Sequence, residues 1–191
     1  MNTKNLIIIA ALLLTSSFSS KIKKNLAKHS DNLIVNGNFA VPAQNGGWHL
    51  YQNIQGWKAV SGEIEIGAYN LYNSNWPAGT QVCEIDGNKN DIVGQTVALK
   101  HHRRCHLAFD YASRSNVPQT SNGLAVSWNG VIVADLETTN DYKIHHWCGE
   151  VHGIAGDNDL SFIGKGSSDS LGTTFTNVVL ECVDYEFYDH N

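Results

Sequence analysis

The segment Leu107–Leu136, LAFDYASRSNVPQTSNGLAVSWNGVIVADL, decides the fold class. Large apolar side chains occupy every second position in Leu107–Ala112 and again in Leu124–Trp128, which is the spacing of β-strands. Asn129-Gly130 is the pair that most readily supplies the two positive φ angles of a type I′ turn. Val131–Leu136 is therefore predicted to return antiparallel as a hairpin. The residues between the first two strands are polar and include a proline, which favours a surface loop.

Similar alternation recurs along the rest of the chain. Further strands are predicted at Asn32–Phe39, Glu63–Ile66, Thr80–Asp86, Ile92–Leu99, Tyr142–Val151, Asp159–Gly164 and Thr174–Val183. Residues 41–56 and 69–79 are predicted to be loops. No window has a sustained apolar period of 3.6, so little helix is expected. About ten short strands separated by turns indicate an all-β protein, either a β-sandwich or a jelly roll.

Length and composition indicate one domain. The chain has 191 residues, 42% of them hydrophobic, which suffices for one core. Residues 1–20 have the charged start, apolar run and small residues of a secretory signal peptide, and the run is shorter than the roughly 20 residues of a membrane anchor. We interpret residues 21–31 as a flexible basic leader, 32–185 as the sandwich and 186–191 as a tail. The mature protein is expected to be extracellular or in a cell wall, without membrane contact after signal cleavage.

Charge and motif content argue against two functional classes. From Asn32 onward the chain holds 17 acidic and 8 basic residues, which argues against a nucleic-acid partner. The carboxylate pairs Glu63/Glu65 and Glu84/Asp86 have members about 7 Å apart on one strand face, a separation found in inverting glycosidases. Solvated carboxylates on an exterior face are the favoured interpretation. No Gly-x-Ser-x-Gly motif occurs, so the sequence does not predict an enzyme.

Four cysteines in an exported chain predict two disulfides. Cys105 lies at the start of the first strand of the central segment, and Cys182 lies at the end of the last strand of the chain. If these two strands are antiparallel neighbours, the start of one lies beside the end of the other. This favours Cys105–Cys182, and Cys83–Cys148 by elimination. Four reduced, buried thiols are the alternative.

Eight short motifs, taken together, resemble a known family. They are Asn32–Phe39, Gly56-Trp57, Ile64–Ile66, Glu84–Asn88, Gln95-Thr96, Leu107–Ala112, Trp128–Gly130, and Ser168–Gly172 before Asn177-Val178. Over nearly all of residues 32–183 they resemble, in order, the DUF642 group and its bacterial choice-of-anchor relatives. The resemblance implies an exported, galactose-binding-like jelly roll without catalytic activity that binds polysaccharide in a cell wall or extracellular matrix.

The resemblance also bears on metal binding. Where relatives usually carry Glu after the first Asn-Gly-x-Phe and Asp before the last Asn-Val, this chain has Ala40 and Thr176. In similar modules those acidic residues help to hold calcium, so their loss predicts no calcium site there. No other cofactor is predicted. Neighbouring histidines, as in His101-His102 and His145-His146, point to opposite faces of a strand. Asp86–Asp91 begins like a calcium loop but lacks the glycine at the sixth place and the glutamate at the twelfth, so it is predicted to be a turn.

Two loops rich in Asn, Gln and Gly carry the aromatic side chains that suit a glycan site. They are Trp48, Tyr51, Tyr69, Tyr72 and Trp76. Sugar C–H faces pack on aromatic rings, and amides bind sugar hydroxyls. The equally weighted alternative is that these loops fold back over the ends of the sandwich. Trp57, Trp128 and Trp147 lie in strand patterns and are expected in the core.

Antiparallel pairing of Leu107–Ala112 with the last strand would bring Arg114 close to Asp169. These two side chains are predicted to form either a polar rim that addresses ligand hydroxyls or a salt bridge that fixes a loop. The leading hypothesis is a secreted, non-catalytic module that binds a polysaccharide or glycan through the loop aromatics and this rim. The competing hypothesis is a structural module that docks another secreted protein.

Overall fold

The computed structural model describes residues 31–137 and 141–183. The predicted signal peptide, nearly all of the predicted leader and the predicted tail lie outside the described residues. The strands are β1 (Trp48–Tyr51), β2 (Asn53–Ile54), β3 (Trp57–Ser61), β4 (Ile64–Ala68), β5 (Gln81–Glu84), β6 (Ile92–Leu99), β7 (Arg103–Ala112), β8 (Leu124–Trp128), β9 (Val131–Leu136), β10 (His145–Gly153), β11 (Gly156–Gly164) and β12 (Thr174–Val183). Two short helices, α1 (Tyr69–Tyr72) and the 3-10 helix η1 (Gln119–Ser121), complete the elements.

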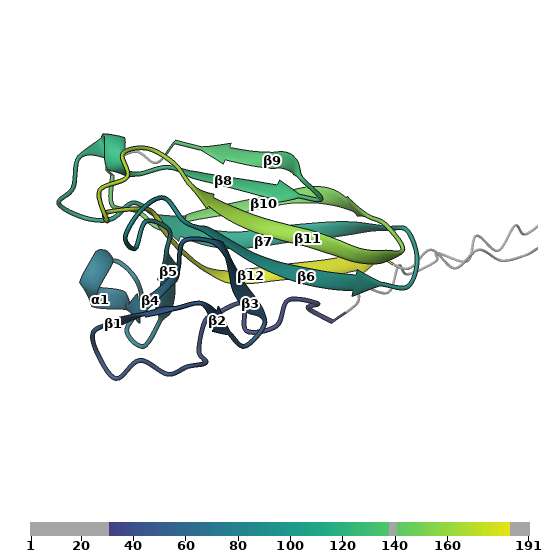
Figure 1. The fold of residues 1–191 in the computed structure, drawn as a ribbon, viewed down its shortest axis with the longest axis horizontal. Coiled ribbons are helices and arrows are strands. Elements are labelled where there is room, and N and C mark those ends of the chain that lie inside the picture. The colour runs from purple at the N-terminus through teal and green to yellow at the C-terminus, as the bar shows by residue number, and fades with distance from the viewer. Residues whose placement is uncertain (1–30, 138–140, 184–191) are drawn as a thin grey trace, which may run out of the picture.

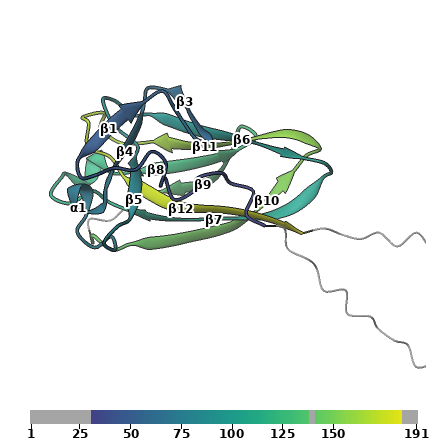
Figure 2. The same cartoon turned by 90° about the horizontal axis from the view of Figure 1, so that it is seen from below.

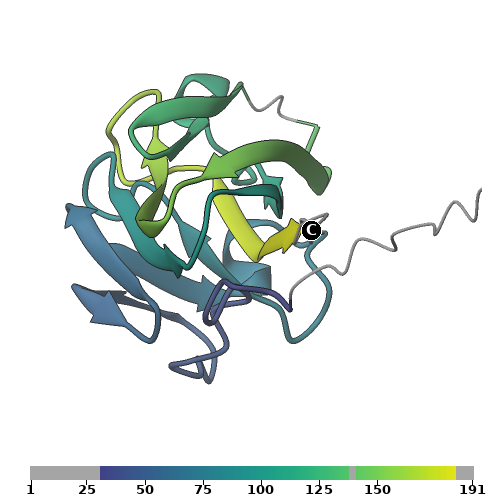
Figure 3. The ribbon, with the colours of Figure 1, turned by 90° about the vertical axis from the view of Figure 1, so that its right-hand side faces the viewer.

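The strands form two antiparallel six-stranded sheets, in agreement with the predicted β-sandwich (Figure 1). Sheet A has the order β1-β4-β5-β12-β7-β10, and sheet B has the order β2-β3-β6-β11-β8-β9. Figure 2 shows the two layers, with β6 and β11 on one side and β7 and β12 on the other. The start of the described chain runs beside the end of β12, where Leu33 N–H donates to Leu180 O over 2.9 Å (Figure 3).

Aromatic side chains fill the space between the sheets. The rings of Phe162 on β11 and Phe175 on β12 stack with centroids 4.1 Å apart, and Phe109 on β7 meets Phe162 edge-on at 5.0 Å. All three side chains are fully buried. Trp57 and Trp128 are also buried and Trp147 packs against the same core, which confirms the core positions predicted for these tryptophans. Burial of such large rings is the main stabilising contribution of this core.

The central segment folds as predicted. Asn129 and Gly130 have φ angles of 50° and 78°, and Trp128 on β8 pairs with Val131 on β9 across the tight turn. β7 and β12 are antiparallel neighbours, with Ala112 opposite Thr174. The predicted bounds of β6 and β12 agree with those observed.

Cys105 and Cys182 lie opposite each other on β7 and β12 and form the predicted disulfide. The second predicted pairing, Cys83–Cys148, is wrong, because both of these cysteines are free. Cys83 on β5 points into the core, whereas Cys148 on β10 is exposed. β12 and β7 stand between the two strands, which places them about 14 Å apart at the usual strand spacing. Elimination alone therefore gave a pair that the sheet order keeps apart.

The predicted first strand, Asn32–Phe39, does not form: residues 35–38 make a turn and the residues on either side belong to no strand or helix. Asn36 and Phe39 adopt φ angles of 55° and 53°, which an extended strand does not allow. The Asn36 side chain holds this turn by accepting from Val41 N–H at 3.1 Å and donating to Gln55 O at 3.2 Å. The predicted loop at 41–56 contains the short strands β1 and β2, and α1 lies within the predicted loop at 69–79. Among the described residues no helix is long and apolar enough to cross a membrane.

Candidate functional site

One face of sheet A points away from the core. Residues directly opposite each other on antiparallel strands project to the same side. The register across β4, β5, β12 and β7 therefore places Glu65, Glu84, Thr174 and Ala112 in one row on this outer face. The inward-facing neighbours of this row belong to the aromatic and aliphatic core.

The α1 segment folds over this row. Tyr72 and Trp76 are each only 2% exposed and form a second small apolar cluster with Val82 and Ala112. The Trp76 indole N–H donates to Thr174 Oγ1 over 3.1 Å. A Cβ on Gly67 would lie 2.2 Å from the Tyr72 hydroxyl oxygen, so the glycine allows the tyrosine ring to approach the sheet. The outer row is thereby closed off from water.

Four carboxylates become buried beneath and beside this cover. Glu65, Glu84, Asp86 and Asp91 are between 0% and 5% exposed, and we call them the carboxylate cluster. The prediction that Glu65, Glu84 and Asp86 are solvated on an exterior face is wrong. They do point away from the core, but α1 and the loop after β11 cover them.

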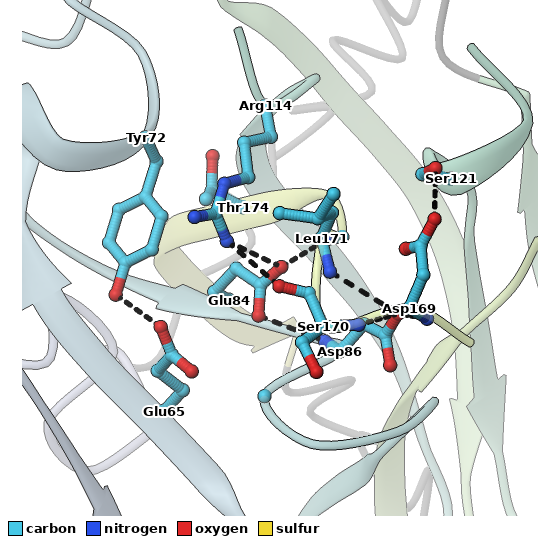
Figure 4. Close-up of polar contacts among 12 residues, drawn as sticks. Glu65, Tyr72, Glu84, Asp86, Arg114, Ser121, Asp169, Ser170, Leu171 and Thr174 are labelled. Carbon is cyan, nitrogen blue, oxygen red and sulfur yellow. Dashed lines mark hydrogen bonds and ion pairs between the residues drawn. The ribbon is translucent and has the colours of Figure 1, made fainter. Parts of the chain in front are cut away.

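Glu84 is held by donors from three directions (Figure 4). Its Oε1 accepts from Gly172 N–H and lies 3.6 Å from Arg114 Nη1, while its Oε2 accepts from Asp86 N–H at 3.1 Å. Burial and the neighbouring Glu65 raise the pKa of Glu84 to about 7, against the opposing effect of Gly172 N–H and Arg114. Burial also raises the pKa of Glu65, although the Tyr72 hydroxyl donates to Glu65 Oε1 over 2.8 Å.

The Asp86 carboxylate organises the loop before β12. Its Oδ2 accepts from the backbone N–H groups of Asp169, Ser170 and Leu171 at 2.9, 3.1 and 3.4 Å. Its Oδ1 is buried and has no hydrogen-bond partner among the described residues. Asp91 binds two further backbone N–H groups, those of Glu63 and Gly87. The carboxylate cluster therefore ties loops together, and its oxygens face protein rather than an open cleft.

Arg114 and Asp169 lie in the same group of loops but do not pair with each other (Figure 4). Arg114 Nη1 donates to Ser170 O over 3.1 Å, and its guanidinium lies 5.3 Å from the centre of the Tyr72 ring. Asp169 Oδ2 instead accepts from the Ser121 hydroxyl at 2.7 Å. The pairing of β7 with β12 brings the two loops together as expected, while η1 supplies Asp169 with a different partner.

The five aromatic residues predicted to form a glycan site differ in how exposed their side chains are. Tyr72 and Trp76 present no open ring face, and Tyr51 and Tyr69 are half-buried. Trp48 on β1 is 53% exposed, and it sits opposite Gly67 on the outer face of sheet A. The interpretation that loops fold back over the sandwich therefore describes Tyr72 and Trp76, while Trp48 keeps a ring available to a ligand.

An open polar pocket of about 380 Å³ lies where β5 and β12 separate. The two strands pair only at Glu84–Thr174 and Cys83–Phe175, and the register of β12 against β7 then shifts between Thr176 and Val179. This shift includes Asn177 with a φ of 53°. A β-bulge of this kind re-aims side chains, so the strands no longer close the space between them.

Amide and hydroxyl side chains line this polar pocket. They are Asn38, Thr80, Gln81, Thr176 and Asn177, and no lining residue is charged. Gln81 is fully engaged, since it donates to Phe39 O and Pro42 O and accepts from Gln44 N–H. Within the described residues, no hydrogen bond engages Asn38 Nδ2, Thr80 Oγ1 or Asn177 Oδ1.

Sequence reasoning did not predict this polar pocket as a site. Its only signal was the pair Ala40 and Thr176, which the structure places together in the pocket wall. Among residues 31–137 and 141–183, no three His, Cys, Asp or Glu side chains are arranged to hold a metal ion. Because Ala40 and Thr176 are both uncharged, the pocket lining carries no charge at these two positions.

No protein-family model and no curated protein matches this chain. Among solved structures, a cyclase from Fischerella sp. TAU is similar with a TM-score of 0.59 and 16% identity, covering 84% of this chain and 100% of the cyclase chain. The family 35 carbohydrate-binding module CBM35 from Paenibacillus barcinonensis has a TM-score of 0.43 and 16% identity, and the similarity covers 71% of this chain and 98% of the module. A family 35 carbohydrate-binding module from Clostridium thermocellum has a TM-score of 0.44 and 17% identity, and the similarity covers 68% of this chain and 93% of the module. The similarity to the cyclase concerns the fold, which is the predicted jelly-roll β-sandwich.

Proposed function

We propose that this protein is a secreted, non-catalytic module that binds a polysaccharide or other glycan of a cell wall or extracellular matrix in the polar pocket. The observation that carries this proposal is the set of unengaged, uncharged groups on Asn38, Thr80 and Asn177. Together they offer amide donors, a hydroxyl and a carbonyl acceptor, which complement the mixed donor and acceptor character of sugar hydroxyls. Export and membership of the DUF642 and choice-of-anchor group are parts of this proposal that rest on the sequence motifs.

A binding role fits the carboxylate cluster better than a hydrolytic one does. Hydrolysis of a glycosidic bond needs two carboxyl groups that flank the bond and reach the sugar. Glu65 and Glu84 are the closest approach to such a pair, since they face each other on β4 and β5. Both are buried, and the Tyr72 hydroxyl and Gly172 N–H occupy one oxygen of each. We assign them to holding the loops.

We propose Trp48 as an additional stacking surface at the edge of the same outer face. Trp48, Gly67 and Val82 follow one another across β1, β4 and β5, which puts the tryptophan roughly 10 Å from β5 at the usual strand spacing. An exposed indole offers an apolar face to sugar C–H groups. Arg114 and Asp169 are committed to loop contacts and we assign them no direct ligand role.

A screen of the mature chain against plant, algal and microbial polysaccharides tests the proposal. We expect retention of at least one glycan, and a loss of about tenfold or more in affinity for the double variant Asn38→Ala/Thr80→Ala, with only a small fall in melting temperature from the lost Ala40 N–H to Asn38 Oδ1 hydrogen bond. Asn45→Ala is the matched control, because Asn45 is an exposed loop asparagine outside the pocket. Equal affinity of the double variant and the control for the retained glycan would rule out this pocket as the site.

Protein docking is the second candidate, and the edge of sheet B favours it. Val131 and Ile132 on the edge strand β9 are 65% and 52% exposed. Exposed apolar side chains on an edge strand suit contact with another protein. Failure to retain any glycan, together with capture of one secreted protein that Val131→Ser/Ile132→Ser releases, would favour this alternative.

A further inference from the structure

A carboxylate stands directly behind the wall of the polar pocket. Asp110 on β7 lies opposite Thr176 in the β7–β12 register, and its Oδ2 accepts from Asn177 Nδ2 over 2.8 Å. Thr176 and Asn177 both line the pocket. The negative charge of Asp110 is therefore one side chain away from any ligand that contacts Asn177.

The hydrogen bond to Asp110 fixes the orientation of the Asn177 amide. An ionised carboxylate only accepts hydrogen bonds, so the amide nitrogen must be the group that faces Asp110. The carbonyl oxygen of Asn177 is then the group left for a ligand. This oxygen accepts from a sugar hydroxyl, whereas the carboxylate of an acidic sugar has no hydrogen to donate to it.

Among the described residues, the basic side chain that contacts Asp110 is a histidine. His146 on β10 faces this carboxylate, with Nδ1 2.8 Å from Asp110 Oδ1 and a side chain that is 61% exposed. The neighbouring His145 contacts Asp141 at 3.0 Å, and Arg104, six residues from Asp110 on β7, contacts Glu150 at 2.8 Å. None of the pocket-lining residues is basic. An anionic ligand therefore meets a carboxylate without a counter-charge in the pocket itself.

We infer that Asp110 makes the polar pocket selective for uncharged glycans over acidic ones, an inference that rests on the proposed function. Asp110 acts as a specificity-determining residue through Asn177, without itself touching the ligand. It repels an acidic sugar by its charge and presents the Asn177 carbonyl to neutral hydroxyls. Repulsion across roughly 8 Å in a partly solvated site corresponds to a preference of about five- to tenfold at low salt.

The test compares matched pairs of ligands. Galactan, glucan and mannan oligosaccharides are each measured beside the same oligosaccharide oxidised at C6 to the uronic acid, by calorimetry or affinity electrophoresis. We expect the wild-type chain to prefer the neutral member by about fivefold or more in 20 mM salt and less in 500 mM salt. Asp110→Asn retains an acceptor for Asn177 but removes the charge, so the preference should fall to about twofold or less. Asp159→Asn, an exposed aspartate on β11, is the matched control and should keep the full preference.

Each result decides a different point. Equal or tighter binding of the acidic members by the wild-type chain would overturn the inference and leave the glycan-binding proposal standing. If Asp110→Asn still preferred the neutral oligosaccharides as strongly as the wild-type chain does, Asp110 would not be the cause of the preference. Failure of the wild-type chain to bind any of these oligosaccharides and any polysaccharide of the screen above would overturn the proposed function together with the inference. Should Asp110→Asn not fold, the salt dependence of the wild-type preference decides, since a preference that is insensitive to salt excludes a charge effect.

Discussion

Glu65 on β4 and Glu84 on β5 face each other directly across neighbouring strands, and both side chains are buried. Two carboxylates on directly opposite residues of neighbouring strands in a poorly solvated site disfavour each other's ionisation. The Tyr72 hydroxyl and the Arg114 guanidinium offset part of that cost. This pair and its partners make the loop end of the sandwich sensitive to pH and to small changes in its cover.

The free energy of unfolding should decrease as pH rises. The pKa of Glu84 is raised from its ordinary 4.5 to about 7 in the folded protein, so folding favours its protonated form. The resulting stabilisation is fully present below about pH 4.5 and is lost as pH rises through about 7, a change of up to about 3 kcal/mol. Glu65 and Asp91, with pKa values also raised by burial, contribute with the same sign.

Urea denaturation of the wild-type chain and Glu84→Gln at pH 5 and pH 8 measures this effect. The difference between the two pH values should be smaller in Glu84→Gln. Glu63→Gln, at a residue just before β4 whose side chain is only half-buried, should behave like wild type. A pH dependence unaltered by Glu84→Gln would show that another group is responsible.

Removal of the α1 aromatics should destabilise the protein strongly. Trp76→Ala and Tyr72→Ala each remove a buried ring and leave a cavity, at a cost of about 3 to 5 kcal/mol. Trp48→Ala removes a ring of the same type from an exposed position and should cost less than about 1 kcal/mol. Thermal unfolding of the three variants provides the comparison. Similar melting temperatures for Trp76→Ala and Trp48→Ala would contradict the covered outer face.

Tyr72→Phe isolates the hydroxyl that donates to Glu65. Its loss leaves a buried carboxylate oxygen without this donor and should cost about 1 to 3 kcal/mol at pH 8. The cost should be smaller at pH 5 than at pH 8, because lower pH moves Glu65, whose pKa burial raises, toward its protonated form, which depends less on this donor. Denaturation at both pH values checks this, and a cost that is larger in acid would speak against the assigned hydrogen bond.

Thiol accessibility should separate the four cysteines into three kinds. In the folded protein only Cys148 should react with an aromatic disulfide reagent, because Cys83 is fully buried and burial raises the pKa of its thiol. Two thiols should react after denaturation and four after reduction. The replacement of Cys105 and Cys182 by Ala opens a loop of 77 residues and should cost about 4 kcal/mol. Reaction of no thiol in the denatured, unreduced protein would instead indicate a second disulfide.

Asp86 should control the order of the loop before β12. Asp86→Ala removes the acceptor of three backbone N–H groups, those of Asp169, Ser170 and Leu171. Their amide hydrogen exchange should accelerate by at least about tenfold, since charge-assisted hydrogen bonds contribute about 1.5 to 3 kcal/mol each. Asp86→Asn keeps one acceptor oxygen and should show a smaller effect. Unchanged exchange at these amides in Asp86→Ala would exclude this role.

Two of the strand pairings, β8 with β9 and β7 with β12, were predictable from the sequence. The Asn129-Gly130 turn and the period-two pattern on both sides specify the β8–β9 hairpin by backbone geometry alone. The Cys105–Cys182 disulfide follows once β7 and β12 are neighbours. The first predicted strand failed for an equally local reason, since Asn36 and Phe39 adopt left-handed φ angles that the apolar pattern does not reveal.

The sequence by itself determined that Glu65 and Glu84 point away from the core, because alternation in a strand assigns opposite faces to neighbouring side chains. Only the tertiary structure decided that this outward face is closed, because Tyr72 and the loop that ends at Gly172 reach it from other parts of the chain. The polar pocket likewise exists only where β5 and β12 separate, at a bulge in the assembled sheet. A periodic pattern specifies the direction of a side chain within its own strand, whereas burial depends on which distant segments pack over it.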